Sequence, residues 1–518
     1  MGKAVGIDLG TTSSSAAVWA DGKSIVIPNS HGSGITPSVV AFTKGMEILV
    51  GQEAFQQSIL NPWGTVHGIK RFMGRRVQAG DSFPGLLPPF VPNEFHAVRF
   101  SIHGREMVPE VLMAFLLKRL MQDASRYLEE DVTEMVIAVP ACFGDAQRQA
   151  ILDAGEIAGA KVLRLINEPT AASLAHHLAG PQKPQTLLIV DLGGGYLDVS
   201  LVDVSEGICE VRSTAGDEHS GGDNFRARLL QWLADELRSE REMDVWQDPQ
   251  SMTLLWEASE RAKCELSHVQ ETEVHIPFMP HGSKKGGHFR RKVSRALLES
   301  LTEDLLGRCR KIVEDVLDHA KVSTQDLDEI LLVGGGTRMP AVQQLLRELT
   351  GGGQRARLVD PGEIVVGGAA ALGAVLQKDL QEVILLDVVP HSVGMEVRGG
   401  HMKTVVEKNA TLPARREEIF STVAGTDEVD VFLFEGEDHR AERNRELGRF
   451  RLKCKPSKGR EPVSIGVTFD MDVNGILHVA AWDSMEKKEE PVAVERGVNL
   501  SEEEIRRLTP EVTGLGRE

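Results

Sequence analysis

The chain repeats one short pattern in two distant places: AVGIDLGTTSSSAAVW contains Asp8, and LLIVDLGGGYLDVSLV contains Asp191. Each copy is typical of an apolar strand that ends in Asp, a turn of Gly and other small residues, and a second strand. In both copies the turn joins strand to strand, whereas the turn of a Walker A sequence, which this chain lacks, leads into a helix. The repeat predicts two similar α/β halves that face each other.

Both turns carry groups suited to phosphate and metal binding. Several backbone N–H groups of a Gly-rich turn can bind one phosphate, and an Asp at a strand end can hold Mg²⁺ directly or through water. We interpret residues 8–12 and 191–195 as two parts of one nucleotide phosphate site. Either turn alone is more often a plain hairpin, so the interpretation depends on the repeat.

A third glycine-rich segment, EILLVGGGTRMPAV, predicts a buried strand, glycines at 334–336, and a helix that begins near Met339 and Pro340. Because glycines have no side chains, a flat ligand can come close to the main chain at 334–336. Arg338 is placed to stack on an adenine ring. The same pattern is also typical of a tight connection between a strand and a helix. The segment by itself leaves both interpretations open.

A fourth segment, MVIAVPACFGDAQRQAILDAGEIAG, predicts a strand, then Pro140, then an amphipathic helix. It is followed by RLINEPTAASLAHH, in which Glu168 precedes Pro169. An acidic side chain at this point can orient a water molecule or can cap the next helix. The sequence leaves both roles open for Glu168.

Charge and cysteine usage limit the partners and the compartment. The chain has 58 Lys and Arg against 76 Asp and Glu, a formal net charge of −18, which repels phosphate backbones and anionic lipid. The 5 cysteines are scattered without a C-x-x-C pair, as expected of packing residues in a reducing compartment. The N-terminus has no apolar signal core, and no run approaches the length of a membrane span. We predict a cytoplasmic protein that binds neither nucleic acid nor membrane.

Secondary-structure patterns divide the chain. Residues 1–378 alternate short β-branched runs with helical patterns, as α/β layers do. Residues 388–499 alternate strands with turns, and Asn474-Gly475 is a strong hairpin signal, so this part is predicted to be all-β. Between them, residues 379–387 contain an apolar run at 383–386 that either docks on another surface or forms the first strand of the β part.

Taken in order, these segments resemble the seventy-kilodalton heat-shock chaperone (DnaK) family over nearly the whole chain. The similarity runs through GIDLGTTSS, IKRFMGRR, PACFGDAQRQA, INEPTAA, DLGGGYLDVS, GDEHSGGDNF, EASERAKCELS, VGGGTRMP, ILLDVVPHSVGMEV and FDMDVNGILHVAA. The resemblance implies an α/β actin-like (RNase H-type) ATPase domain of two lobes at 1–378 and a hydrophobic linker at 379–387. It further implies an all-β sandwich that binds peptides at 388–499 and a short helix with a tail at 500–518.

The resemblance also implies a site for ATP or ADP with Mg²⁺ between the lobes. It assigns catalysis to Lys70, Glu168, Asp191 and Asp198, and it assigns metal binding, directly or through water, to Asp8 and Asp191. The implied contacts to phosphate and adenosine are Gly10, Thr11, Thr12, Gly193, Gly194, Gly195, Tyr196, Gly221, Glu260, Lys263, Ser267, Gly335 and Arg338. These residue types suit phosphoryl transfer, which depends on positioning and charge neutralisation. Without the motif, we would interpret Lys70 as a solvated surface lysine. We would interpret Glu260 and Lys263 as an ion pair on the face of a helix.

Communication between the domains is implied by the same resemblance. The residues that it assigns to coupling are Pro140, Arg148, Arg164, Leu385, Leu386 and Asp387. Among them, Arg164 and Asp387 resemble positions at which a J-domain co-chaperone contacts the family. The other implied partners are unfolded polypeptide clients and a nucleotide exchange factor of the GrpE type. ATP is expected to favour the state in which the linker and β domain dock, and peptide the undocked state.

Several positions depart from the family pattern. Tyr196 stands where the motif usually has threonine, so the hydroxyl expected to face the phosphate is carried by a much larger ring. Cys142 replaces a usual tyrosine and Gly144 a usual asparagine, near the relay and the co-chaperone surface. We expect slower or repositioned catalysis and an altered specificity of partner contact, unless neighbouring residues compensate.

The peptide site of the β domain departs further. The resemblance places Met395, Val397, Arg398, Phe420, Val423 and Asp430 around it. An unpaired buried carboxylate is costly, so we expect Asp430 to be wet, protonated or paired. Arg398 and Asp430 would then add a charged element that disfavours purely aliphatic peptides. If the alignment slips by one residue, Asp430 turns outward and Val429 or Val431 faces the pocket instead.

The end of the chain predicts only a short helix. Ser501 with Glu504 forms a capping box, and Pro510 is expected to end the helix. The family's long helical lid does not follow Arg507, either because the protein is a short member or because the chain is truncated. Without a lid, peptide is expected to bind and dissociate faster.

These observations favour an ATP-dependent molecular chaperone, a slow ATPase that converts ATP to ADP and phosphate. The alternative is a nucleotide-binding co-chaperone or regulatory protein of the same fold with little turnover, which Tyr196 and the altered pocket favour. The retained Asp8, Lys70, Glu168 and Asp191 and the linker favour the first interpretation. A small-molecule kinase of this fold would have no use for the β domain.

Overall fold

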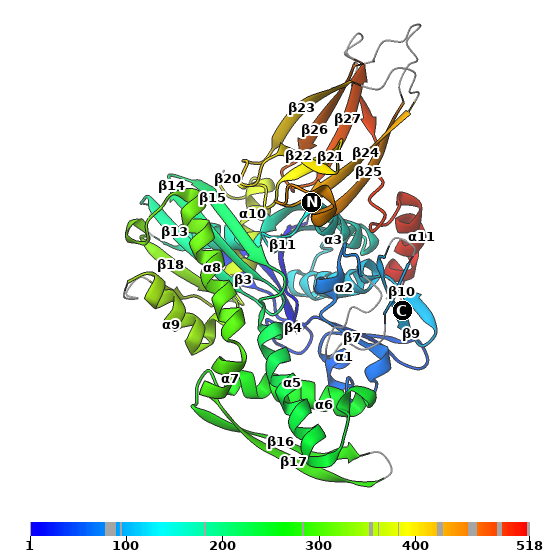
Figure 1. The fold of residues 1–518 in the computed structure, drawn as a ribbon, viewed down its shortest axis with the longest axis vertical. Helices are drawn as coiled ribbons and strands as arrows, with labels where there is room; N and C mark the ends of the chain where they lie inside the picture. The colour runs from blue at the N-terminus through cyan, green and yellow to red at the C-terminus, as the bar shows by residue number, and fades with distance from the viewer. Residues whose placement is uncertain are drawn as a thin grey trace.

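The computed structural model describes residues 2–77, 90–93, 96–180, 183–281, 284–351, 356–360, 362–381, 383–421, 428–453, 464–483 and 489–514. Figure 1 shows a broad α/β part, blue to yellow-green, from which a narrow β part, yellow to red, projects at one end. The last helix of the chain returns to the α/β part and lies beside the helices of its first half.

The first half of the α/β part is built on one mixed sheet with the strand order β12-β11-β1-β2-β3. Strands β1, β11 and β12 are parallel, and β2 and β3 are antiparallel additions. The strands are β1 (Val5–Leu9), β2 (Ser13–Ala20), β3 (Lys23–Val26), β11 (Glu134–Val139) and β12 (Lys161–Asn167), with β4 (Thr36–Pro37) paired to β2. The inner strands are buried on both faces, which is why they read as continuous apolar runs.

The second half repeats this arrangement. Its sheet has the order β19-β18-β13-β14-β15-β20, in which β13, β18 and β19 are parallel and β14 and β15 are antiparallel. The strands are β13 (Gln185–Leu192), β14 (Leu197–Ser205), β15 (Ile208–Asp217), β18 (Glu329–Val333), β19 (Ala356–Leu358) and β20 (Ile384–Leu386). The internal repeat therefore corresponds to two sheets of one topology, as the sequence pattern predicts.

Two helices rich in small residues lie where the halves join. Helix α4 (Glu168–Ala179) packs against α10 (Ile364–Leu376), and α10 also packs against β1, β2 and β11. A Cβ atom added to Gly368 would lie 1.9 Å from the carbonyl oxygen of Ala171, and one added to Gly6 would lie 2.1 Å from the nitrogen of Ala370. The glycines are required because the main chains approach this closely.

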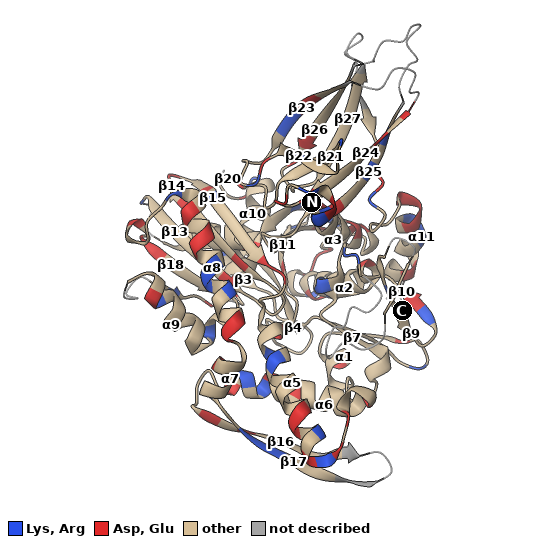
Figure 2. Cartoon of the chain, viewed as in Figure 1, with Lys and Arg blue, Asp and Glu red and all other residues tan. Residues whose placement is uncertain are grey.

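The other helices and strands surround the two sheets. Helices of the first half are α1 (Gln52–Gln56), α2 (Pro109–Leu128) and α3 (Asp145–Ile157), with strands β5 (Val39–Phe42), β6 (Ile48–Val50), β7 (Thr65–His67), β8 (Phe90–Pro92), β9 (Val98–Ile102) and β10 (Arg105–Met107). The second half has α5 (Gly222–Arg241), α6 (Pro249–Glu265), α7 (Arg295–Leu301), α8 (Glu303–Ala320) and α9 (Pro340–Leu349), with the hairpin β16 (Glu271–His281) and β17 (Lys284–Ser294). Acidic and basic residues are interspersed along α5 and α8 (Figure 2).

The apolar linker is a strand of the second sheet. β20 pairs in parallel with β15, with Ile208 opposite Ile384 and Glu210 opposite Leu386. Leu385 packs against the apolar cluster between the two halves, whereas Ile384 is 49% exposed. Of the two interpretations left open by the sequence, the structure adopts docking on the α/β part.

The β part is a sandwich of two antiparallel sheets with the orders β22-β21-β24-β25 and β23-β26-β27-β28. Its strands are β21 (Val393–Val397), β22 (His401–Val406), β23 (Ala414–Ser421), β24 (Glu428–Glu435), β25 (Arg445–Lys453), β26 (Ser464–Met471), β27 (Leu477–Asp483) and β28 (Glu489–Val492). Apolar residues of both sheets form one core. The predicted hairpin at Asn474-Gly475 is confirmed, because Gly475 has a φ of +74° in the β26–β27 turn.

The last helix, α11 (Glu502–Thr513), begins at the predicted capping box of Ser501 and Glu504. The prediction that Pro510 ends it is wrong, because Pro510 lies inside the helix. Tertiary packing explains the difference: Ile505 and Val512 are buried against the first half, and Lys118 Nζ donates hydrogen bonds to the carbonyl oxygens at the helix end.

Three of the four described cysteines are packing residues. Within the described residues Cys142, Cys209 and Cys309 are buried, as expected of packing residues, but Cys264 is exposed. Cys454 lies outside the described residues. Among the described helices, none has the length and apolar character needed to cross a membrane.

Candidate nucleotide site

The two repeated turns lie against each other. A Cβ atom added to Gly194 would lie 2.3 Å from Thr12 Oγ1, and one added to Gly195 would lie 2.4 Å from Thr11 Oγ1. Beside them is a cavity of about 200 Å³ lined from both halves by Asp8, Gly10, Thr11, Thr12, Ser13, Ser14, Ser15, Ile35, Lys70, Glu168, Asp191, Gly193, Gly194, Gly195, Tyr196, Val333, Gly334, Gly335, Gly362 and Val365. The structure thus brings the carboxylates of Asp8 and Asp191 to one cavity.

Crowded carboxylates dominate the electrostatics of this cavity. Burial, and then the Glu168 carboxylate, raises the pKa of Asp8 to about 7, although Lys70 opposes the shift. The same two causes raise the pKa of Asp198 to about 7. The pKa of Asp191 is raised well above its ordinary value by burial, then by Glu168, Asp198 and Asp8. Such a cluster favours a cation, because a positive charge would relieve the repulsion between its members.

The carboxylates suit Mg²⁺, which prefers oxygen ligands and keeps several of its waters. Within the described residues, no three His, Cys, Asp or Glu side chains are placed to hold a metal ion together. The donor set therefore fits a cation that takes one or two carboxylates and fills its other positions with phosphate oxygens and water. The metal binding by Asp8 and Asp191 that the resemblance implies stays a prediction.

Lys70 is buried in the site. It lies in the short 3-10 helix η2 (Ile69–Phe72), is 2% exposed, and its Nζ is 2.5 Å from Glu168 Oε1. The alternative of a solvated surface lysine is therefore wrong. Glu168 is the first residue of α4, and its carboxylate is directed to Lys70. The Glu168 side chain does not cap this helix, whose N-cap residue is Asn167.

Tyr196 follows the second turn and is also buried. Its hydroxyl donates a hydrogen bond of 3.2 Å to the main-chain carbonyl oxygen of Lys70. The expectation of a hydroxyl that faces the phosphate is therefore corrected. The longer side chain carries the hydroxyl past the turn to the segment that holds the lysine.

The residues expected to hold adenosine lie outside this cavity, except Gly335. Lys263 Nζ donates to the carbonyl oxygen of Gly222 and pairs with Glu260 at 2.9 Å, so the helix-face pair does form. Ser267 and Lys263 line a separate small cavity of about 20 Å³. Arg338 is exposed at the end of the 3-10 helix η5 (Gly335–Arg338). Gly221 packs against the second turn, where an added Cβ atom would lie 2.3 Å from the carbonyl carbon of Gly195.

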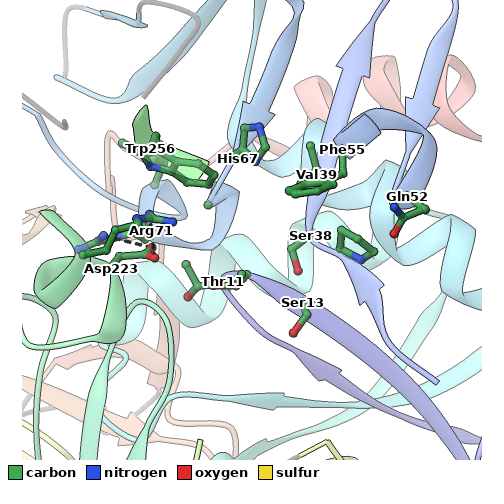
Figure 3. A pocket seen from close by; sticks show the side chains of 15 residues that line it. Thr11, Ser13, Ser38, Val39, Gln52, Phe55, His67, Arg71, Asp223 and Trp256 are labelled. Atoms are coloured by element: carbon green, nitrogen blue, oxygen red, sulfur yellow. Dashed lines mark hydrogen bonds and ion pairs between the residues drawn. The ribbon is translucent and has the colours of Figure 1, made fainter. Parts of the chain in front are cut away.

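A second cavity of about 260 Å³ adjoins the first turn (Figure 3). Trp256 of α6 and His67 of β7 pack against each other in its wall, with ring centroids 5.0 Å apart and an interplanar angle of 56°. The Arg226 guanidinium stacks 3.7 Å from the Trp256 ring centroid. Burial, and then Arg226, lowers the pKa of His67 to about 4, so the imidazole is neutral at pH 7. The sequence offered no signal for this cavity, because its residues come from distant segments.

The residues expected to couple the domains lie between the α/β and β parts. Arg148 is buried and donates to the carbonyl oxygens of Phe143 and Ala141, to Asn167 Oδ1 and to the carbonyl oxygen of Asn474 in the β part. Pro140 is buried at the start of the same loop, and Arg164 is partly buried on β12. Burial lowers the pKa of Arg164, although Asp387 and Asp472 oppose the shift.

Asp387 ends the linker and is 9% exposed. It accepts a hydrogen bond of 3.0 Å from Thr170 Oγ1 on α4, the helix that begins with Glu168. Leu386 is partly buried in strand β20. The linker is therefore bonded directly to an element of the nucleotide site.

Other contacts between the two parts were not foreseen. Asp145 of α3 accepts hydrogen bonds from the nitrogen of Leu477 and from Arg496. Glu218 pairs with Arg75 and with Arg445 of β25, and these partners hold its pKa at about 2 despite its burial. Asp145 and Glu218 both lie in motifs of the family resemblance, but their partners are far away in the chain.

The peptide-site prediction is partly overturned. The structure places Met395 in the core of the β part, Val397 and Phe420 partly buried against it, and Arg398 on the surface. Val423 lies outside the described residues. Asp430 is exposed and its Oδ1 is 2.7 Å from Arg451 Nε on the next strand, while Val429 and Val431 face the core. The position of Asp430 at the pocket centre is therefore wrong, because the alternating faces of β24 turn it outward.

Comparison with known proteins now decides the family. A family model described as "Hsp70 protein" matches residues 4–514. The chain belongs to the Hsp70 family. It is similar to the chaperone protein DnaK of Thermus thermophilus, at 44% identity over 99% of this chain and 83% of the relative. It is also similar to the chaperone protein dnaK of Cyanidioschyzon merolae, at 43% over 99% and 84%, and of Cyanidium caldarium, at 42% over 99% and 83%.

Membership in the Hsp70 family confirms the resemblance on which the site residues were predicted. The mixed α/β part followed by a β part agrees with the family. Hsp70 proteins are ATPases that bind nucleotide, and the chaperone function follows from membership.

Proposed function

We propose that this Hsp70 protein is an ATP-dependent chaperone in which nucleotide between the two turns controls how the β part holds unfolded polypeptide segments. One observation carries the proposal: the linker strand β20 belongs to the same sheet as β13, in which Asp191 is the next-to-last residue. A shift of β13 relative to its neighbours can therefore reach the linker through β14 and β15 without leaving the sheet.

We assign the phosphates to the facing turns, because their backbone N–H groups and the hydroxyls of Thr11 and Thr12 line the cavity together. Asp8 and Asp191 would hold Mg²⁺, directly or through water, which would neutralise charge on the phosphates. Lys70 supplies a second positive charge, and Glu168 keeps its ammonium in place. Glu168, Asp191 and Asp198 are assigned to orient the attacking water by their match to the family motifs.

We assign the adenosine to the region beside the main cavity where α6 approaches the end of η5. Lys263 and Glu260 lie at its edge on α6, and Gly335 with Arg338 lies on η5. Ser267 and Gly221 complete the set. Arg338 is exposed and is therefore free to stack on a base, an arrangement that suits its planar guanidinium.

Clients are proposed to bind the β part as extended segments, near Met395, Val397 and Phe420. Because Asp430 turns outward and pairs with Arg451, it adds no charge to a site near these three residues, and we expect clients to be apolar segments. A J-domain co-chaperone and a GrpE-type exchange factor are the proposed regulators. ATP hydrolysis to ADP and phosphate is proposed to switch the protein from release to retention of clients.

A second function is favoured by one observation. Tyr196 removes the threonine hydroxyl that the family motif places beside the phosphates, and its own hydroxyl bonds to Lys70 instead. A protein that binds nucleotide with little turnover, and acts as a co-chaperone, would have this property. Single-turnover hydrolysis by the wild type and Lys70→Ala separates the two functions: equal rates would favour the second.

The proposed coupling is tested by ATP-triggered release of a fluorescent apolar peptide. We expect ATP to accelerate release from the wild type, and Leu385→Asp to abolish that acceleration because the side chain packs between the two halves. Ile384→Asp is the matched control, since Ile384 lies in the same strand but is 49% exposed. Wild-type release that does not respond to ATP would contradict the proposal, as would equal effects of the two linker variants.

A further inference from the structure

Tyr196 belongs to the second half of the α/β part by sequence but to the first half by packing. It lies between the glycine turn at 193–195 and strand β14. Its ring is 4% exposed and packs within the apolar core of the first half. The ring of Phe143, which is fully buried, meets it edge to face with centroids 5.2 Å apart. A side chain of one half is therefore inserted into the other.

The hydroxyl of this inserted side chain donates a hydrogen bond of 3.2 Å to the main-chain carbonyl oxygen of Lys70. That carbonyl oxygen also accepts the bond from the nitrogen of Met73 that closes η2. Burial, and then Glu218, raises the pKa of Tyr196 well above its ordinary value, so the hydroxyl remains a donor at neutral pH. The bond therefore fixes the turn from which the Lys70 side chain projects.

The Lys70 ammonium is confined by the same aromatic pair. Its Nζ lies 5.9 Å from the centroid of the Tyr196 ring and 5.7 Å from that of Phe143. Glu168 fixes the far end of the side chain. Tyr196 thus contacts the lysine at both its main chain and its charged end, whereas a threonine at this position would be too short to span that distance.

We propose that Tyr196 is the positioning residue for Lys70: its inserted ring and its hydroxyl hold the lysine in the place where it acts on the phosphates. The inference rests on the proposed ATP hydrolysis. It also gives the departure from the family threonine a physical role. The second turn keeps its bare glycines for the nucleotide and uses the following residue to hold the catalytic lysine.

A double-mutant cycle tests the proposal with single-turnover ATP hydrolysis and, separately, nucleotide affinity. Tyr196→Phe removes only the hydroxyl, and we expect the rate to fall about fivefold, the effect of one hydrogen bond, with affinity unchanged. In the Lys70→Ala background the same substitution should change nothing further. Tyr127→Phe is the matched control, because Tyr127 is the other of the 2 tyrosines and is 44% exposed.

An unchanged rate in Tyr196→Phe would overturn the proposal, and so would an equal loss in both backgrounds, since Tyr196 would then act independently of the lysine. If Tyr196→Phe does not fold, wild-type protein labelled with fluorotyrosine gives a second measurement. Lys70→Ala should shift the ¹⁹F resonance of Tyr196 and leave that of Tyr127 in place, and an unmoved Tyr196 resonance would refute the contact. A wild type no faster than Lys70→Ala would instead refute the proposed function.

Discussion

The two glycine-containing turns share one sequence plan but present different surfaces to the nucleotide cavity. The first turn, at 8–12, ends in two threonines whose side chains lie against Gly194 and Gly195, whereas the second turn, at 191–195, ends in three glycines. The second turn needs glycines at 194 and 195 because the side chains of Thr12 and Thr11 occupy the space that their Cβ atoms would fill. A repeated motif can thus be specialised, with one copy supplying functional groups and the other supplying space.

The strands behind the turns differ in charge as well. Asp8 lies opposite Ser15 in the antiparallel pair of the first sheet, whereas Asp191 lies opposite Asp198 in the second. The extra carboxylate is one reason why the pKa of Asp191 is raised well above its ordinary value, while that of Asp8 is raised to about 7. The second half therefore carries the larger excess of negative charge at the site.

The largest effect is expected when a glycine of the second turn is given a side chain, because this removes the difference between the two turns. In Gly195→Ala the new Cβ atom would lie 2.4 Å from Oγ1 and 3.1 Å from Cγ2 of Thr11, which is buried. We expect ATP affinity to fall at least about tenfold, as overpacking costs of this kind imply. The measurement is titration with a fluorescent ATP analogue.

Gly335→Ala serves as the control for this prediction. Gly335 lines the same cavity, but an added Cβ atom would meet nothing within 4 Å. The melting temperature should stay that of the wild type, and ATP affinity should change less than in Gly195→Ala. If the two variants lost ATP affinity equally, the close approach of the first turn would not be the reason that position 195 requires glycine.

The charge difference is tested through the pH dependence of stability without nucleotide. Asp8 keeps its proton up to about pH 7 in the folded protein but only to about 3.8 in the unfolded chain, so the folded state binds more protons between these values. Its contribution to the free energy of unfolding therefore falls as pH rises through this window, by at most about 1.4 kcal/mol per pH unit. Asp8→Asn should remove this slope in chemical denaturation.

Asp191→Asn should act in the same direction, since the pKa of Asp191 is raised too. Exposed Asp21 provides the control, and Asp21→Asn should leave the pH profile as it is in the wild type. The opposite result would be a wild-type free energy of unfolding that rises between pH 4 and 7, with a rise that Asp8→Asn removes. That result would refute a raised pKa of Asp8 in the folded protein.

The smallest expected effect comes from the first turn. Thr11→Val keeps the shape of the buried side chain and removes its hydroxyl. We expect ATP to bind about fivefold more weakly, the effect of one lost hydrogen bond, with little change in melting temperature. Isothermal titration calorimetry is the measurement. An unchanged affinity would show that the backbone of the turn alone binds the phosphates.

Much of the architecture was predictable from local patterns. The repeated strand-turn-strand segments predicted two similar halves, and the order β12-β11-β1-β2-β3 of the first sheet corresponds to β19-β18-β13-β14-β15 of the second. The Asn474-Gly475 signal predicted a hairpin that forms. These predictions succeeded because strand alternation and turn chemistry act between residues that are close in the chain.

The predictions that failed depended on distant partners or on register. Pro510 was expected to end a helix that packing on α2 and α3 carries to Thr513. Asp430 was placed in a pocket, although a shift of one residue along the strand turns it to Arg451 at the surface. The hydroxyl of Tyr196 was expected at the phosphate, but the length of the side chain brings it to Lys70 instead.

The amino-acid order alone determined the family, the division into α/β and β parts, and the chemical groups available to the nucleotide, because these are recorded in motifs and periodicity. Only the tertiary structure decided that the linker becomes an edge strand of the second sheet and that Tyr196 enters the core of the other half. Both outcomes require surfaces formed by segments far apart in the chain, and such surfaces exist only once those segments have packed together.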